Sequence, residues 1–258
     1  MIQADWNPNL YSEFAGLRLR PALDLMMRIG ALPPGGVVDL GCGAGAVGPV
    51  LKARFRDRRL SGVDASPAML ERARATGVYD MLEQADAARW VPTLPPALIF
   101  SNALLHWLPD HDTLLPTLAG GLAPGGTLAV QVPYQNAAPS HHTWHDLVAQ
   151  HFPGRFDPGD APGILDATAY HRILSPYGRV DVWETEYLQV LPASRTAHPV
   201  RQFTSSTYAR PVLATLNATE AAQLCALYDE AMMRAYPPNE DGSVMFSFRR
   251  LFFKLDIL

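Results

Sequence analysis

The segment Val37-Val38-Asp39-Leu40-Gly41-Cys42-Gly43-Ala44-Gly45 carries the strongest structural signal in this chain. A short apolar run leads into an acid, and three glycines follow at alternate positions. This order predicts a buried strand, a tight turn and a helix over residues 46–55. Because glycine tolerates a positive φ angle and leaves space beside the main chain, a bulky ligand can lie against this turn.

A second acid follows the next apolar run. Asp64 comes nineteen residues after Gly45, directly behind the apolar residues 60–63. An acid at the tip of a second strand can accept hydrogen bonds from two ribose hydroxyls. The two segments together therefore predict a nucleoside pocket at the carboxyl ends of parallel strands.

The nature of this nucleoside depends on Asp39. Residues 43–48 also match the G-x-G-x-x-G pattern of dinucleotide sites, which alone is weak evidence. A carboxylate directly before the glycine turn suits the amino group and sulfonium of S-adenosylmethionine better than the pyrophosphate of NAD. We therefore predict S-adenosylmethionine as the cofactor, with a dinucleotide as the alternative.

Composition limits the class of protein and its partners. The 258 residues suffice for one large α/β domain or for a core with a cap, and 48% of them are hydrophobic. A net charge of −4 argues against a broad nucleic-acid surface but allows a small anionic substrate. Cys42 and Cys225 are too few for a disulfide framework or a metal cluster, so no metal is predicted. Cys42 lies inside the glycine turn, where a small residue fits, so we predict a packing role for it, with a nucleophilic role as the alternative.

The sequence shows neither a targeting signal nor a membrane span. Its first residues lack the basic and apolar regions of a signal peptide, and no apolar run reaches the ~18 residues that a span requires. We therefore predict a cytoplasmic protein without a membrane partner. Its oligomeric state is left open between a monomer and a weak dimer.

Strands and helices alternate along residues 36–133, which predicts an α/β fold with a doubly wound, mostly parallel sheet. Seven strands are predicted at residues 37–40, 60–63, 81–85, 98–101, 127–132, 180–190 and 246–255. Helices are predicted at residues 21–29, 46–55, 111–122, 167–174 and 219–236. A further helix begins after Ser66, its predicted N-cap, and Thr219 is the predicted N-cap of the last one.

The whole chain, residues 1–258, is predicted to form a single domain with two parts. Residues 36–133, about 166–192 and 243–257 would form the cofactor-binding core. Residues 1–32, 134–165 and 193–242 interrupt the regular alternation of strands and helices. We expect them to form a helical lid over the carboxyl ends of the strands, on the substrate side.

A third acid extends the predicted cofactor site. Asp86 follows the third strand and can accept a hydrogen bond from the amine of adenine, or it can simply cap a helix. Acids at three successive strand ends are a more specific signal than any one of them, and Leu40, Ala65 and Met69 could enclose the purine. Met69 by itself is more typical of a core residue. The predicted cofactor contacts are Asp39, Gly41, Gly43, Gly45, Asp64, Ala65, Met69, Asp86, Ala87 and Asn102.

The segment after the fourth strand, residues 101–110, is the predicted place of the reacting group, because ligands of open α/β sheets bind at strand carboxyl ends. His106 could act as a general base or donate a hydrogen bond to the substrate, and a purely structural histidine is an equal alternative. Trp107 could form a wall of the pocket or fill the core. These two residues are the catalytic candidates.

The glycine turn and residues 62–70 and 102–110 resemble class I S-adenosylmethionine-dependent methyltransferases. More narrowly, nearly the whole chain resembles the trans-aconitate 2-methyltransferase family. The restrictive motifs are Trp6-Asn7-Pro8 with Tyr11, Arg20-Pro21-Ala22, Trp107-Leu108-Pro109-Asp110-His111, Val180-Asp181-Val182-Trp183 and Tyr236-Pro237 with Arg250-Leu251-Phe252. The resemblance implies a Rossmann-like methyltransferase that esterifies one carboxylate of a small polycarboxylic acid.

Such a substrate implies arginines that hold its remaining carboxylates, because the guanidinium fork matches a carboxylate. Arg18, Arg20, Arg210 and Arg250 are the candidates, and Trp6, Tyr11 and Tyr134 are possible pocket contacts. The predicted substrate residues are Trp6, Tyr11, Arg20, Tyr134, Arg210 and Arg250.

Two departures from the family pattern leave the acceptor open. Tyr134-Gln135 replaces Asp-Asn after the fifth strand, and Tyr208-Ala209 replaces Gly-Leu before Arg210. One alternative is a methyltransferase for a hydroxyl, amine or carbon with His106 as its base. The others are a dinucleotide-dependent oxidoreductase and a non-catalytic nucleoside-binding protein.

Overall fold

A computed structural model describes residues 15–161, 163–205 and 207–258. The chain divides into two compact units, which are described separately below. Unit 1 comprises Met1–Pro133, Ile164–Thr185 and Arg250–Leu258, and unit 2 comprises Tyr134–Gly163 and Glu186–Arg249.

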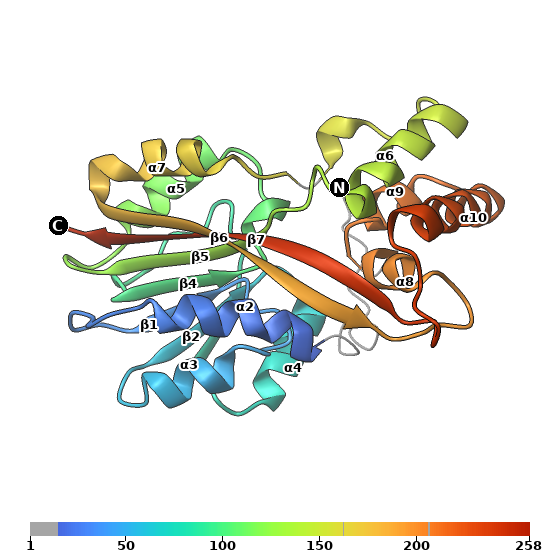
Figure 1. The fold of residues 1–258 in the computed structure, drawn as a ribbon. Coiled ribbons are helices and arrows are strands. Elements are labelled where there is room, and N and C mark those ends of the chain that lie inside the picture. The colour runs from blue at the N-terminus through green and yellow to red at the C-terminus, as the bar shows by residue number, and fades with distance from the viewer. Residues whose placement is uncertain (1–14, 162, 206) are drawn as a thin grey trace. The chain divides into compact units, whose positions relative to one another are not determined.

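A seven-stranded sheet forms the centre of the fold, with strand order β3-β2-β1-β4-β5-β7-β6 (Figure 1). Strands β1 to β5 are parallel, and β7 pairs with β5 in the antiparallel direction. The prediction of a mostly parallel, doubly wound, seven-stranded sheet is therefore confirmed. The strands are β1 (Val37–Leu40), β2 (Leu60–Asp64), β3 (Met81–Gln84), β4 (Leu98–Asn102), β5 (Thr127–Pro133), β6 (Gly178–Leu191) and β7 (Val244–Ile257).

Helices of unit 1 cover both faces of this sheet. In Figure 1, α5 and α7 lie on one face, while α3 and α4 lie on the opposite face. The helices are α2 (Ala15–Met27), α3 (Gly48–Arg54), α4 (Pro67–Ala75), α5 (His111–Gly120) and α7 (Ala167–Leu174), with 3-10 turns η1 (Leu105–Trp107) and η3 (Ser175–Tyr177). Helix α2 begins earlier than the predicted residue 21 and carries Pro21 inside it.

The strands next to the glycine turn are held by an apolar core. All four residues of β1 are buried, and Leu98, Ile99 and Phe100 of β4 are fully buried. Burying a large apolar side chain contributes about 1.5–3 kcal/mol, so these strands form a rigid base for the loops that follow them. Tyr170 of α7 strengthens this base, because its hydroxyl lies 2.9 Å from Nδ1 of His111, whose Nε2 lies 2.9 Å from the carbonyl oxygen of Leu105.

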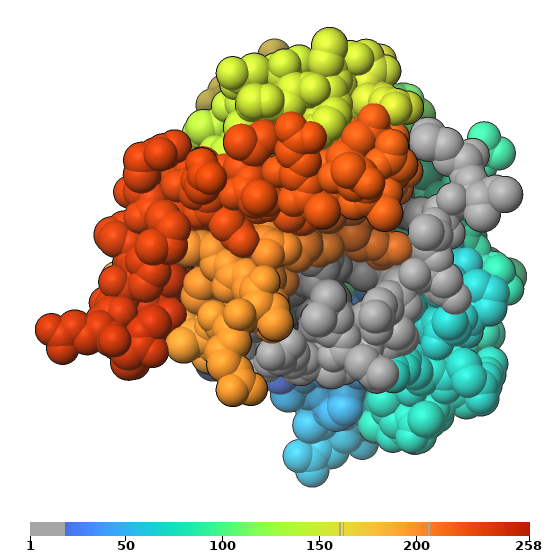
Figure 2. All heavy atoms as spheres, turned by 90° about the vertical axis from the view of Figure 1, so that its right-hand side faces the viewer, coloured from blue at the N-terminus to red at the C-terminus, as the bar shows by residue number. Residues whose placement is uncertain are grey.

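Unit 2 is mostly helical and includes residues 186–191 of β6 and residues 244–249 of β7. Its helices are α6 (Pro139–His151), α8 (Pro199–Ser205), α9 (Arg210–Ala214) and α10 (Ala218–Ala235), with the 3-10 turn η2 (Pro158–Asp160). Helices α6 and α10 lie side by side on the face shown in Figure 2. Buried Trp144 stacks on Tyr228 at 3.9 Å, and the Tyr228 hydroxyl donates to the carbonyl of Ser140 at 2.8 Å.

The start of α10 corrects one prediction. Asn217, not Thr219, is the N-cap, because its side chain accepts a hydrogen bond from the Glu220 backbone while the Glu220 side chain accepts one from the Asn217 backbone. This reciprocal capping box satisfies two backbone donors, which a cap at Thr219 would not do. Neither α10 nor any other described helix is long and apolar enough to cross a membrane.

Candidate active site

The glycine turn after β1 has the backbone shape that its sequence predicts. Gly41, Gly43 and Gly45 have φ angles of +76°, +54° and +81°. A side chain at Gly41 would approach Leu104 to 2.8 Å, whereas at Gly43 nothing lies within 4 Å of the position of a Cβ atom. The main chain at Gly43 is therefore open on the side where a ligand can approach it.

Gly43→Ala tests whether this open side is used. A left-handed alanine costs about 1–2 kcal/mol, and a methyl group in a ligand contact costs a further 1–3 kcal/mol, or about ten- to a hundredfold in affinity. We therefore expect a modest loss of stability together with a large loss of affinity for S-adenosylhomocysteine, measured by calorimetry. The control is Gly154→Ala, because Gly154 also has a positive φ angle of +78° and open space around it. Equal affinities of the two variants would contradict the prediction.

Asp39 is a buried carboxylate at the centre of this site. Its side chain is 2% exposed, and Oδ2 accepts a hydrogen bond of 2.7 Å from the Tyr79 hydroxyl. Burial raises the pKa of Asp39 from 3.8 to about 7; the Tyr79 hydrogen bond opposes this rise, and the charge of Asp64 adds to it. A buried acid of this kind is stabilised in its charged form by a cation, such as the amino group of an amino-acid ligand.

Asp64 orders the turn around Asp39. Its Oδ2 accepts from the backbone nitrogen of Gly43 and its Oδ1 from that of Ser66, both at 2.9 Å. Ser66 caps α4 as predicted, since its side chain accepts from the Met69 nitrogen. The Asp64 carboxylate thus fixes the glycine turn and the start of α4 at one strand end, while each oxygen keeps a second lone pair for a ligand hydroxyl.

Asp86 has a local role in the structure. It lies exposed beyond β3, and its Oδ1 accepts from the Ala88 backbone nitrogen at 3.0 Å. Among the described residues, β3 is followed by a turn at residues 87–89 and not by a helix, so the predicted alternative of a helix cap is not found. A contact of Asp86 with adenine remains a prediction. Ala65 is exposed, whereas Met69 and Ala87 are buried.

The end of β4 carries the second part of the site. Ala103 has a positive φ of 56°, which is strained for a residue other than glycine and turns the chain directly into η1. Its backbone nitrogen donates to the Gln131 carbonyl at 2.8 Å. His106 and Trp107 are half-buried in η1, with ring centroids 4.8 Å apart and planes inclined at 45°. The strained turn thus places both catalytic candidates next to the end of β4.

Three neighbouring strands carry a row of polar side chains at this end of the sheet. The register pairs Asn102 with Gln131, and Pro133 with Arg250, so Asn102, Gln131 and Arg250 share one face. Gln131 is fully buried and Arg250 is 4% exposed, and Arg250 Nη1 lies 3.5 Å from Gln131 Oε1. Within the described part of the chain, Gln131 Nε2 and Asn102 Oδ1 are buried without a hydrogen-bond partner. Buried polar atoms of this kind mark a place for a polar ligand or water.

The remaining substrate candidates are distributed over both units. Arg20 is exposed on α2 of unit 1. Tyr134 and Arg210 are half-buried in unit 2, where the Arg249 guanidinium lies 5.2 Å from the centre of the Tyr134 ring. Arg18 lies in α2, but its side chain is not described, and Trp6 and Tyr11 lie outside the described residues. Asp39, Asp64, Asn102 and Arg250 therefore belong to one sheet, and every predicted substrate contact, Arg250 included, remains a prediction.

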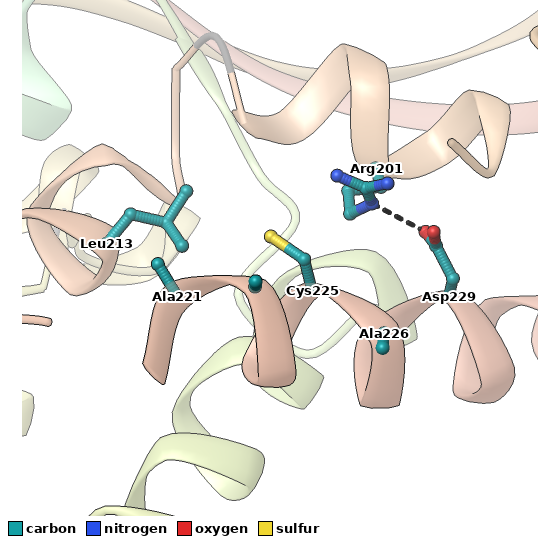
Figure 3. A pocket seen from close by; sticks show the side chains of 7 residues that line it. Arg201, Leu213, Ala221, Cys225, Ala226 and Asp229 are labelled. Atoms are coloured by element: carbon teal, nitrogen blue, oxygen red, sulfur yellow. Dashed lines mark hydrogen bonds and ion pairs between the residues drawn. The ribbon is translucent and has the colours of Figure 1, made fainter. Parts of the chain in front are cut away.

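A hollow in unit 2 is a different feature. It has a volume of about 440 Å³ and is lined by Arg201, Leu213, Ala221, Ala222, Cys225, Ala226 and Asp229 (Figure 3). Arg201 Nε donates to Asp229 Oδ1 at 2.7 Å, so the two charged groups of this lining neutralise each other. The charged groups of this lining are therefore already paired with each other, which makes the hollow a poor site for an anionic substrate.

Sequence and structure comparisons agree with this geometry. The model of the methyltransferase-domain family matches residues 12–180. A trans-aconitate 2-methyltransferase from Methylobacterium radiotolerans is 42% identical, covering 96% of this chain and 97% of its own, and one from Methylobacterium nodulans is 41% identical over the same shares. The structure of geranyl diphosphate C-methyltransferase from Streptomyces coelicolor with S-adenosylhomocysteine has a TM-score of 0.55 at 16% identity, covering all of this chain and 85% of that one.

The fold and the site thus define a Rossmann-like, S-adenosylmethionine-dependent methyltransferase. Asp39 and the open side of Gly43 suit this cofactor, because they offer a buried anion and a close approach to the main chain. The chain belongs to the family of trans-aconitate 2-methyltransferases.

Two site residues were missed in the sequence analysis. Tyr79 lies between recognised motifs, and no spacing pattern connects it with Asp39, forty residues away. Gln131 could have been noticed, because it is a polar residue within the apolar run of the fifth strand. A polar residue in a strand that is buried on both faces needs a hydrogen-bond partner. Its presence in such a strand therefore indicates a possible binding site.

Proposed function

We propose that this enzyme transfers a methyl group from S-adenosylmethionine to one carboxylate of a small polycarboxylic acid of the trans-aconitate type, giving a monomethyl ester. The observation that carries the proposal is the buried Arg250 beside Gln131, at the same end of the sheet as Asp39. A guanidinium and an amide NH₂ group together form a donor set for a carboxylate. The relatives' activity, as their names state it, supports the same acceptor.

The chain's own residues can perform this reaction mainly by positioning. When bound, S-adenosylmethionine supplies an electrophilic methyl group on a positively charged sulfur. Asp39 would hold the amino group of the cofactor, Asp64 the ribose, and Gly43 would allow close approach. Arg250 and Gln131 would hold a carboxylate that does not react, and so orient the reacting one. Such alignment of two reactants can contribute about 7–11 kcal/mol to lowering the barrier.

No general base is required in this mechanism. A carboxylic acid has a pKa near 4, so its carboxylate is already ionised and nucleophilic at neutral pH. We further propose that the acceptor is a small anion and that the enzyme works in the cytoplasm as a monomer or a weak dimer. The free thiols of Cys42 and Cys225 are compatible with a reducing compartment.

The test is a panel of acceptors incubated with S-adenosylmethionine. We expect release of S-adenosylhomocysteine and a product heavier by one methyl group with trans-aconitate or a related di- or tricarboxylate, detected by mass spectrometry. The product should be hydrolysed by base, as an ester is and an ether or amine is not. Absence of turnover with every polycarboxylate, combined with turnover of an amine, alcohol or carbon acceptor, would overturn the proposal.

His106→Ala separates this mechanism from one that needs a base. If a carboxylate is the nucleophile, we expect kcat to stay within about threefold of wild type and KM to rise, since loss of a general base costs about 10²–10⁴-fold in rate. Single-turnover rates at saturating acceptor measure the chemical step directly. His171→Ala is the control, because His171 is exposed on α7. A fall in the single-turnover rate of a hundredfold or more in the His106 variant alone would favour the base mechanism.

A further inference from the structure

Tyr79 connects the glycine turn to Asp39. Its hydroxyl donates to Asp39 Oδ2 at 2.7 Å and lies beside the Gly48 backbone at the start of α3. We propose that Tyr79 is a positioning residue that keeps the Asp39 carboxylate charged and oriented for the cationic amino-acid end of S-adenosylmethionine. The proposal concerns the cofactor alone and does not depend on the acceptor.

The space for the Tyr79 ring is created by three glycines from different segments. A Cβ atom at Gly48 would lie 2.6 Å from the Tyr79 hydroxyl oxygen, and Cβ atoms at Gly45 and Gly62 would lie 3.1 Å and 3.0 Å from ring carbons. The glycine turn, α3 and β2 therefore all leave out a side chain at the point where this ring lies. Such close packing fixes the phenol in one position, with its hydroxyl directed at Asp39.

The charges around Asp39 show why this hydrogen bond matters. Among the described residues, the titratable groups that face Asp39 are Tyr79, Asp64 and Cys42. Asp64 is a like charge that opposes ionisation of Asp39. Burial and the carboxylates of Asp39 and Asp64 raise the pKa of the Cys42 thiol, which stays neutral. Burial and Asp39 also raise the pKa of Tyr79, which remains a protonated donor. Tyr79 thus favours the charged form that burial disfavours.

This arrangement predicts a specific pH dependence. Protonation of Asp39 removes the negative charge that attracts the ligand's amino group, so affinity should fall as the pH drops through about 7. Tyr79→Phe keeps the ring and its packing but removes the hydrogen bond. The pKa of Asp39 then rises, and the fall in affinity should begin at a higher pH than in wild type. The ligand's own ionisation is the same for both proteins and cancels in this comparison.

The experiment is calorimetric titration of S-adenosylhomocysteine into wild type and Tyr79→Phe between pH 6 and 9. We expect the variant to bind about tenfold more weakly near pH 7.5, because a hydrogen bond to a charged group shifts the equilibrium by about this factor or more. The two affinities should converge toward pH 9. Near pH 7.5 the variant should also release more protons on binding, as measured in buffers of different ionisation enthalpy.

Tyr170→Phe is the matched control. Tyr170 is another buried tyrosine of unit 1, and its hydroxyl hydrogen-bonds to His111 and the Leu165 backbone. This variant should lose stability to a similar extent without changing the pH profile of binding. If Tyr79→Phe lowers affinity by the same factor at every pH, or leaves the profile unchanged, Tyr79 has only a packing role and the proposal is overturned.

Discussion

Asp39→Asn is expected to make the free enzyme more stable near pH 8 and at the same time to remove most of its affinity for the cofactor. The pKa of Asp39 is raised from 3.8 to about 7 in the folded protein, chiefly by burial. The folded state therefore binds this proton more tightly than the unfolded state does. The contribution of Asp39 to the free energy of unfolding therefore falls as the pH rises from about 4 to about 7. Above pH 7 the loss of stability caused by its buried charge is constant.

The size of the stability effect follows from this difference in pKa. The change from 3.8 to about 7 corresponds to at most about 4 kcal/mol near pH 8, because each pKa unit is worth about 1.4 kcal/mol. Asparagine removes the buried charge and keeps an oxygen that accepts from Tyr79. It also adds amide donors that need partners, so we expect a net gain of about 1–3 kcal/mol. Urea denaturation at several pH values measures this gain, which should vanish near pH 4.

The effect on the cofactor has the opposite sign. Removing one partner of a buried, hydrogen-bonded charge pair costs about 2–5 kcal/mol, so the affinity for S-adenosylhomocysteine should fall by about thirtyfold or more. Asp57→Asn, at an exposed position of the same unit, should change neither quantity. A variant that binds the ligand normally would show that Asp39 does not hold its amino-acid part. A variant that is less stable near pH 8 would show that the buried charge is not a cost.

The fold was predictable from local features of the sequence. The apolar runs at β1 and β4 belong to strands that are buried on both sides, and the alternation with helices allows few other topologies. Ser66 was predictable as a cap because Pro67 follows it. The prediction of Thr219 as the cap of α10 was wrong, because Glu220 completes a capping box with Asn217 and the helix therefore begins one residue earlier, at Ala218. The lengths of β6 and β7 were underestimated, since both strands continue for 14 residues from one unit into the other.

The site was predictable only where short motifs at the ends of successive strands contain it. Asp39, the glycines and Asp64 lie in successive loops at neighbouring strand ends, so the strand order brings them together. The partners of these residues come from further away. Arg250 meets Gln131 only because β7 pairs with β5 in a register that joins residues 119 positions apart. The sequence indicates Arg250 only as one of four candidate arginines. The pairing of β7 with β5 is needed to show that Arg250 is buried.

Arg250→Met is expected to reduce kcat/KM for a tricarboxylate by about a hundredfold, with a smaller change in stability. Arg250 is 4% exposed, and its guanidinium group supplies donors at the end of the sheet that holds Asp39. Hydrogen bonds to charged groups contribute about 1.5–3 kcal/mol, and a fork of two such bonds explains the larger end of this range. Arg250→Lys should recover only part of the loss, because lysine keeps the charge and lacks the fork. Gln131→Leu should reduce kcat/KM for the same substrate by about tenfold.

The control for this prediction is Lys254→Met on the same strand. Lys254 is also buried, but its ammonium group is 2.6 Å from Asp256, and the Arg179 guanidinium also contacts this carboxylate at 3.1 Å. Its loss should lower stability, because it removes one partner of a buried ion pair, without a specific effect on kcat/KM. Substrate binding is separated from folding if Lys254→Met loses stability and keeps its kcat/KM, while Arg250→Met loses kcat/KM and keeps most of its stability.

The decisive comparison combines each variant with a substrate that lacks one carboxylate. If Arg250 and Gln131 hold a carboxylate that does not react, wild type should lose kcat/KM on the shortened substrate, and the Arg250 and Gln131 variants should lose little more. Non-additivity of this kind is evidence that the two changes remove the same interaction. If the Arg250 and Gln131 variants lose kcat/KM by the same factor on the full and the shortened substrate, these residues do not hold the missing carboxylate. That result would leave the enzyme's activity on polycarboxylates untouched. No turnover of any acid by wild type would instead refute the acceptor class, so the two failures can be distinguished.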